Sequence, residues 1–177
     1  MKWKNYNCEN CFYFVTATLR NFTPLFLDKE IVSFVLRSLD YLRNNKGLKI
    51  YAYVVMPEHI HFIGSCKGKI TTIVGDFKRF TSREIARYME INNPMLFEKV
   101  KADAYKGQNY AIWQETFRSE VIYEKKFLEQ KINYTHNNPV RRGLVANAGD
   151  WTYSSFNQIM SDNHSGTELF IDVMVSV

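Results

Sequence analysis

Apolar residues recur along the first part of the chain with spacings that predict strands and one helix. The aromatic and β-branched run at 12–19 predicts a strand, and residues 28–45 carry apolar side chains at helical spacing. The runs at 48–56 and 59–66 predict two further strands, because only a proline and a glutamate separate them. A connection this short makes the two strands neighbours in a hairpin.

The second part of the chain continues this alternation. Residues 70–90 predict a helix whose outer side is basic, and residues 95–107 are polar, without a clear period, and are expected to contain a loop. A short strand is expected at 118–123. A third helix follows at 124–138, and Pro139 is expected to end it.

The order strand, helix, strand, strand, helix, strand, helix is that of a ferredoxin-like α+β sandwich. We therefore expect one antiparallel sheet of four to five strands, with the helices packed mainly on one face. The strand at 59–66 would then be central. Residues 1–160 are expected to form a single domain, and residues 161–177 a C-terminal tail of uncertain structure.

Composition and charge narrow the function classes. The chain has 177 residues, of which 46% are hydrophobic, as is usual for a soluble domain. Its net charge of +5 permits a polyanionic partner such as nucleic acid. No apolar run is long enough to span a bilayer, no signal peptide opens the chain, and the three cysteines suit free thiols, so we expect a cytoplasmic protein without a membrane partner.

The basic residues are grouped rather than scattered. Lys78, Arg79 and Arg83 fall within one predicted helix, and Arg141 and Arg142 follow another. Either group could neutralise phosphates of a nucleic acid. The alternative is that each group forms an ordinary solvated helix face.

A pair of histidines is the first candidate for chemistry. His59 and His61 are two residues apart on a predicted strand, so their side chains share one face. Neutral imidazoles so placed are good ligands for Mn²⁺ or Zn²⁺, and less preferred ones for Mg²⁺. With four histidines in the chain, the chance of such a pair is roughly 0.1, and either imidazole could instead be a hydrogen-bonded core residue.

Tyr134 and Asn138 form the second candidate, because residues four apart share a helical face. A tyrosine hydroxyl is a poor nucleophile until a neighbour such as a divalent cation stabilises its phenolate. The Asn138 amide could be a third ligand to that cation; alternatively it caps the helix, and Tyr134 only packs. His136 faces elsewhere, and Glu58 is expected to point away from the two histidines if it belongs to their strand.

Five segments, in this order, resemble the IS200-like transposases, and within them the REP-associated tyrosine transposases. The resemblance covers roughly residues 10 to 157. The segments are Val-Val-Met-Pro-Glu-His-Ile-His-Phe at 54–62, Phe-Lys-Arg-Phe-Thr-Ser-Arg-Glu-Ile at 77–85, Trp113-Gln114 before Phe117, the stretch 134–145, and Asp-Trp-Thr-Tyr-Ser-Ser-Phe at 150–156. An asparagine followed by proline at 138–139 is usual in the REP-associated branch.

The resemblance implies an HUH endonuclease, in which Ile60 is the hydrophobic residue between two histidines. It implies that His59, His61 and Asn138 bind a divalent metal, Mg²⁺ or Mn²⁺, and that Tyr134 is the nucleophile. The implied reaction cuts single-stranded DNA beside a hairpin, leaving a 5′-phosphotyrosine and a free 3′-hydroxyl that can later rejoin strands. Glu58 departs from the family, in which asparagine is frequent at this position.

Other functions remain open at this stage. The chain could bind repeat hairpins without cutting them, or be a metal-dependent phosphoesterase that uses water as its nucleophile. Monomer and homodimer are both compatible with the sequence. The helix that carries Tyr134 could complete the site of its own chain or that of a second copy.

Overall fold

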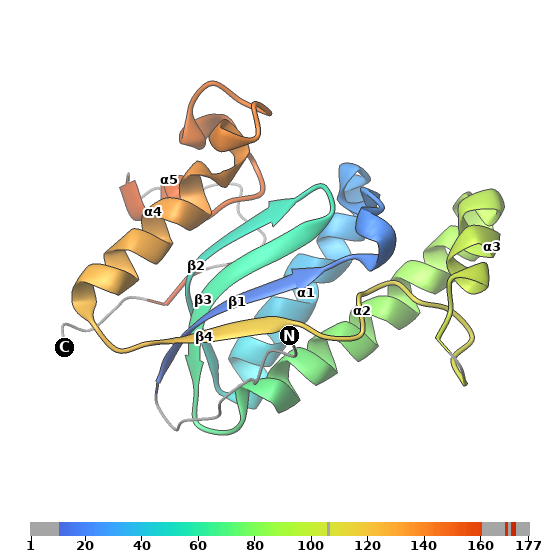
Figure 1. Ribbon diagram of the computed structural model, residues 1–177, viewed down its shortest axis with the longest axis horizontal. Helices are drawn as coiled ribbons and strands as arrows, with labels where there is room; N and C mark the ends of the chain where they lie inside the picture. Colours follow the sequence, from blue (N-terminus) through green and yellow to red (C-terminus); the bar gives the residue numbers. More distant parts are fainter. Residues whose placement is uncertain (1–10, 106, 161–168, 170, 173–177) are drawn as a thin grey trace.

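The computed structural model describes residues 11–105, 107–160, 169 and 171–172. Four strands form one antiparallel sheet in the order β2-β3-β1-β4 (Figure 1). They are β1 (Phe12–Thr18), β2 (Leu48–Met56), β3 (His59–Cys66) and β4 (Arg118–Ile122). The four strands expected from the sequence are thus confirmed, and β3 is central.

Two long helices connect the strands. After β1 the chain forms short 3₁₀ turns, η1 (Arg20–Phe22) and η2 (Leu25–Leu27), and then α1 (Lys29–Lys46). After β3 it forms α2 (Ile70–Asn92) and α3 (Pro94–Ala102), and after β4 it forms α4 (Lys125–Arg141), η3 (Ala148–Asp150) and α5 (Phe156–Met160). The order β1-α1-β2-β3-α2-β4 and the strand order confirm the ferredoxin-like α+β fold.

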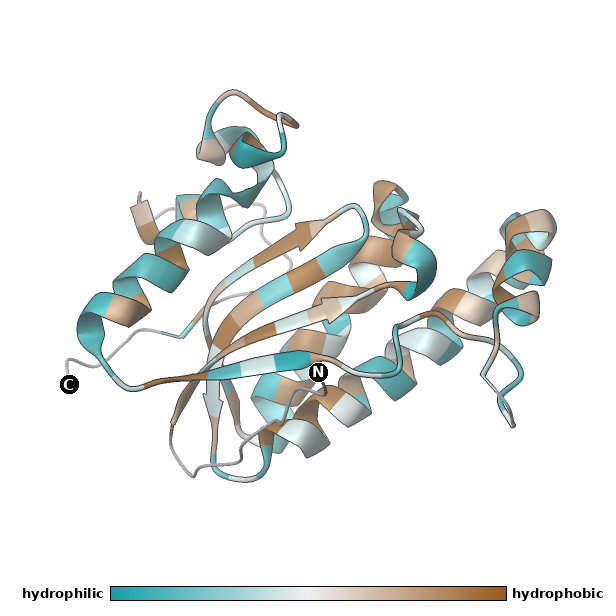
Figure 2. Ribbon diagram, in the orientation of Figure 1, coloured by the Kyte–Doolittle hydropathy of each residue, from teal (hydrophilic) through white to brown (hydrophobic). Residues whose placement is uncertain are grey.

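Helices lie on both faces of the sheet. Strand alternation places Val15 and Phe62 in the large core under α1 and α2, and Phe14 and Ile63 in a smaller cluster under α4. Figure 1 shows α4 on the opposite side of the sheet from α1 and α2. Figure 2 shows strands that are largely apolar beside helices that are only partly so. The strands therefore read as nearly continuous apolar runs because both of their faces are covered.

The free edge of β2 is closed by the segment after η3. The Val55 amide donates to the Tyr153 carbonyl at 2.8 Å, and the Ser155 amide donates to the Tyr53 carbonyl at 3.1 Å. The Trp151 indole adds a bond to the Val55 carbonyl at 2.9 Å. These bonds satisfy the backbone groups that an edge strand would otherwise expose.

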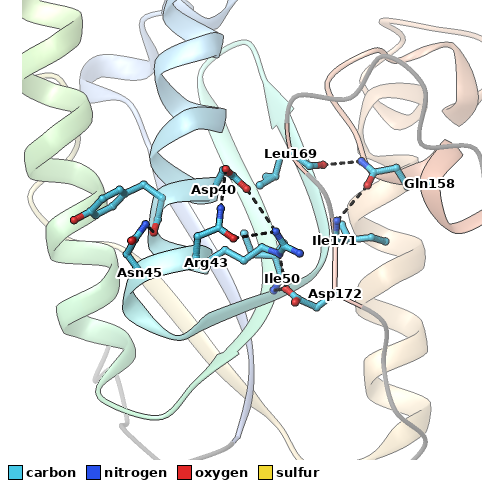
Figure 3. A network of polar contacts seen from close by, with 10 residues as sticks. Asp40, Arg43, Asn45, Ile50, Gln158, Leu169, Ile171 and Asp172 are labelled. Atoms are coloured by element: carbon cyan, nitrogen blue, oxygen red, sulfur yellow. Dashed lines mark hydrogen bonds and ion pairs between the residues drawn. The ribbon is translucent and has the colours of Figure 1, made fainter.

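Three described residues beyond α5 are held against α1 and β2 (Figure 3). Asp172 accepts from the Ile50 amide at 2.9 Å and pairs with the Arg43 guanidinium at 3.1 Å. The side chain of Gln158 donates to the Leu169 carbonyl at 3.0 Å and accepts from the Ile171 amide at 3.2 Å. The rest of the segment 161–177 lies outside the described residues.

Helix α3 was not apparent from the sequence pattern. The Asn93 side chain accepts a hydrogen bond from the Leu96 amide at 3.2 Å, and Pro94 occupies the first turn. Asparagine at an N-cap followed by proline is a strong helix start. The same residues that end α2 therefore begin α3, and the expected loop begins only at Asp103.

The prediction that Pro139 ends the tyrosine-bearing helix is wrong by two residues, because α4 continues to Arg141. A proline this close to the end removes only one donor, and few helical residues follow it. The helix then closes with bonds from Gly143 to Val140 and from Leu144 to Pro139, both 2.9 Å long. With Gly143 at φ +67°, this is a Schellman ending.

Candidate active site

The two histidines of β3 face each other across one point on the α4 side of the sheet. Their Nε2 atoms are 3.1 Å apart, and their ring centroids are 4.6 Å apart. His61 is buried, and His59 is half-buried. The expectation that both imidazoles share a face of a central strand is therefore confirmed.

The outer nitrogen of each imidazole already has a partner. His59 Nδ1 lies 3.1 Å from Glu58 Oε1, and His61 Nδ1 lies 2.8 Å from the Thr16 hydroxyl on β1. An ionised carboxylate can only accept, so His59 carries its proton on Nδ1. The Thr16 hydroxyl can accept a hydrogen bond from His61 Nδ1–H in the same way. Both Nε2 atoms then present lone pairs towards the same point, as metal-binding imidazoles do.

Burial keeps both imidazoles neutral. Desolvation, helped by the nearby His59 and Lys131, lowers the pKa of His61 to about 3. Burial also lowers the pKa of His59, although the Glu58 carboxylate acts in the opposite direction. Neutral rings at neutral pH are the form in which histidine binds a metal ion.

Tyr134 of α4 lies over this pair within the same chain. Its ring centroid is 5.5 Å from that of His61 and 5.8 Å from that of Phe14 on β1. The Arg141 guanidinium sits 5.1 Å from the Tyr134 ring. The histidines and the tyrosine, 73 residues apart at their nearest (61 to 134), line one open groove of about 680 Å³.

Three side chains of α4 are spaced at four-residue intervals along one helical face. Tyr134 contacts His61, and Arg142, at the C-cap, donates from Nη1 to Glu58 Oε1 at 2.7 Å. Glu58 in turn holds His59. Asn138 lies one turn after Tyr134 and one turn before Arg142, and it is buried, although it is not among the residues that line the groove.

The donor set fits a divalent cation. Two nitrogens 3.1 Å apart can both bind one ion at about 2.1 Å, with an angle of roughly 95° between them. Among the described residues, no group of three or more His, Cys, Asp or Glu side chains could hold a metal ion. A third protein ligand would therefore be of another kind, and the amide oxygen of the buried Asn138 is suited to that role.

The basic residues of α2 are not part of the groove. Helix α2 packs on the opposite face of the sheet, so Lys78, Arg79 and Arg83 lie away from Tyr134. The Lys78 ammonium donates to the carbonyls of Gln114 and Glu115 at 2.6 and 3.0 Å, and burial lowers its pKa to about 8, against the opposing effect of the Glu115 carboxylate.

Both candidate arginines of α2, Arg79 and Arg83, have carboxylate neighbours. Arg79 pairs with Asp76 at 3.0 Å, and Arg83 pairs with Glu84 at 3.1 Å. The five basic candidates therefore form two separate groups, and the groove belongs to the group at the end of α4.

Two residues of the site were not recognised from the sequence. Thr16 becomes visible only through the register of β1 with β3, where it is paired with His61. Glu58 was expected to point away from the histidines only if it belonged to their strand; it belongs instead to the turn before β3, and its carboxylate lies beside His59. His136, which was expected to face elsewhere, is buried and bonds the Ser155 hydroxyl at 2.9 Å.

Comparisons with known proteins show the family of the chain. The family model described as "Transposase IS200 like" matches residues 7–138. A REP-associated tyrosine transposase of Escherichia coli (strain K12) is 27% identical over 157 residues, covering 89% of this chain and 83% of that protein. A putative REP-associated tyrosine transposase of Haemophilus influenzae is 24% identical over 153 residues, covering 82% and 80%.

The fold also matches a solved structure described as a REP-associated tyrosine transposase bound to a REP hairpin. The TM-score is 0.72 at 19% sequence identity, over 100% of this chain and 94% of that chain. At this identity the match concerns the fold. Within the described residues, no helix is both long and apolar enough to cross a membrane. Because the family model spans most of the sequence, the chain belongs to the IS200-like transposase family.

Proposed function

We propose that this protein cuts and rejoins single-stranded DNA beside a hairpin, with Tyr134 as the nucleophile. The observation that carries the proposal is the convergence of His59, His61 and Tyr134 on one groove from distant parts of the sequence. The transposase family supports it, as does the hairpin bound by a structural relative. Both segments of the groove come from one chain, which supports a site that a single copy completes.

His59, His61 and Asn138 are the proposed ligands of a divalent cation, Mg²⁺ or Mn²⁺. A bound cation would polarise the scissile phosphate and favour the tyrosine phenolate. The protein supplies the geometry, because Glu58 and Thr16 hold the two imidazoles with their Nε2 atoms turned inward. Their burial keeps them neutral, so protons do not compete for the ligand nitrogens at neutral pH.

The chemistry is a transesterification. The Tyr134 oxygen forms a bond to the phosphorus while the bond between phosphorus and the 3′-oxygen breaks. The tyrosine proton passes to solvent, and the departing oxygen takes up a proton to become a 3′-hydroxyl. One phosphodiester replaces another, so a 3′-hydroxyl can later attack the 5′-phosphotyrosine and rejoin strands without an energy source.

The basic residues are proposed contacts to the DNA backbone at two places. Arg141 and Arg142 at the end of α4 lie beside the groove and would meet phosphates near the cut. Lys78, Arg79 and Arg83 on the other face would meet a more distant part of the DNA. Loss of any of these charges should weaken binding and make it less dependent on salt.

The proposal is tested with a labelled oligonucleotide that carries a hairpin and single-stranded flanks, incubated with protein and Mn²⁺. We expect a covalent protein–DNA adduct on a denaturing gel, which Tyr134→Phe abolishes while hairpin binding remains. Tyr123→Phe is the matched control, because Tyr123 is 82% exposed and lies outside the groove.

Each of the other possible results would indicate a different nucleophile or a different function. An adduct that persists in Tyr134→Phe would move the nucleophile to another residue. Cleavage that survives without any adduct would identify a phosphoesterase that uses water. Tight hairpin binding without cleavage under either cation would leave a DNA-binding module.

A further inference from the structure

Phe22 is an exposed aromatic residue in the lining of the active-site groove. Its side chain is 65% exposed, and with Pro24 and Pro57 it forms an apolar part of the same groove that holds His59 and Tyr134. Single exposed aromatic residues are common and need no explanation. Phe22 differs from such residues in its backbone conformation.

The backbone of Phe22 is held in the left-handed region. Asn21 and Phe22 both have φ of +53°, and among the described residues they are the two non-glycine positions with positive φ. Asparagine tolerates this region, whereas for a bulky residue such as phenylalanine it is a genuine outlier. Strain of this kind persists only where the surroundings impose it, and it clusters at ligand sites.

The surroundings do impose it, since hydrogen bonds hold the three residues that precede Phe22. The Leu19 amide donates to the Glu58 carbonyl and the Arg20 amide to the Ile112 carbonyl, both at 2.8 Å. The Asn21 side chain donates to the Asp103 carboxylate at 2.6 Å. These bonds fix the backbone that leads into Phe22, yet the Phe22 ring gains little burial in return. A glycine would fit this backbone with less strain, so the aromatic ring is not explained by folding.

We propose that Phe22 is a stacking platform for an unpaired nucleobase next to the scissile phosphate. A base in this part of the groove would lie on the aromatic ring while its phosphate faces the histidines. Aromatic stacking of this kind is tolerant of sequence, because every base has a π-face. The inference rests on the proposed function, since it assumes that the groove takes single-stranded DNA.

The experiment measures hairpin-DNA binding by fluorescence anisotropy in the Tyr134→Phe background, so that cleavage does not interfere. We expect Phe22→Ala to weaken binding about tenfold, as loss of one stacked base does, and Phe22→Trp to keep it. Tyr123→Ala is the control for removing an exposed aromatic ring outside the groove. Phe22→Gly should also weaken binding without lowering Tm, because glycine relieves the backbone strain.

A series of DNAs, each with one abasic site in the single-stranded flank, then locates the stacked base. At one position, we expect the abasic DNA to bind the parent protein and Phe22→Ala equally. Equal binding of intact DNA by Phe22→Ala and its parent would overturn the stacking inference alone. So would a loss in Phe22→Ala that persists with every abasic DNA. Failure of the parent to bind hairpin DNA at all would instead overturn the proposed function, and the inference with it.

Discussion

Glu58 joins the end of α4 to the first histidine of the site. It is buried, and its Oε1 accepts from Arg142 at 2.7 Å and lies 3.1 Å from His59 Nδ1. A buried carboxylate is tolerated only with partners of this kind. Glu58 thereby fixes the proton of His59 on the outer nitrogen and compensates the charge of Arg142.

This arrangement predicts that Glu58→Gln weakens Mn²⁺ binding about tenfold, as loss of a partner to a metal-binding histidine does. Arg142→Gln should weaken it less, and the double variant should be no worse than Glu58→Gln, because Arg142 acts through Glu58. Isothermal titration calorimetry without DNA measures all three affinities.

The control is Glu98→Gln, which removes the same charge from an exposed ion pair with Lys101 on α3. It should bind Mn²⁺ as the wild type does. Unchanged affinity in Glu58→Gln, or additive losses in the double variant, would refute the role given to Glu58.

Sequence spacing could predict those residues of the site whose relative positions follow from local backbone geometry. The shared face of His59 and His61 follows from strand alternation alone, and the structure confirms it; their role as metal ligands stays a prediction. Thr16 could not be found in this way, because its contact with His61 depends on strand register across 45 residues of sequence. Glu58 could not be placed in this way either, because strand alternation does not apply to a residue of the turn.

Among the elements, α4 carries the proposed nucleophile, Tyr134. Tyr134 and Asn138 lie on this helix and Arg142 is its C-cap, and the bond from His136 to Ser155 ties it to the segment that closes β2. The prolines explain where sequence reasoning erred. Pro139 was taken as a stop although it only removes one bond near the end, and Pro94, which begins α3, was not recognised as a helix start.

The central strand predicts a contrast between two glycines. A Cβ at Gly64 of β3 would stand 2.5 Å from the Lys49 carbonyl oxygen, whereas a Cβ at Gly75 of α2 would meet nothing within 4 Å. We expect Gly64→Ala to lower the free energy of unfolding by about 1–3 kcal/mol. Gly75→Ala should raise it by up to about 1 kcal/mol, because alanine is the better helix former.

Urea denaturation of the two variants and the wild type measures both changes. Gly75→Ala is the matched control, since it adds the same methyl group where there is room for it. Equal stability of Gly64→Ala and wild type would show that β2 and β3 are not as closely paired at this point as the structure has them.

In the whole molecule, the sheet stands between two helical layers and separates the groove from the basic residues of α2. The groove lies on the α4 face, and the basic residues of α2 lie on the other. The order of elements could be predicted because the apolar runs are long and their periods distinct. The face of the sheet that α4 covers could not be predicted from the sequence. It depends on the direction in which the chain turns after β4, and no local sequence pattern indicates that direction.

The central claim is that one chain uses Tyr134 to form a covalent link with the 5′ end of cut DNA. The most direct measurement is peptide mapping by mass spectrometry of the adduct formed with hairpin DNA and Mn²⁺, after nuclease and protease digestion. We expect a nucleotide remnant, joined through its 5′-phosphate, on the peptide that contains Tyr134. A remnant on any other residue of the chain would contradict it.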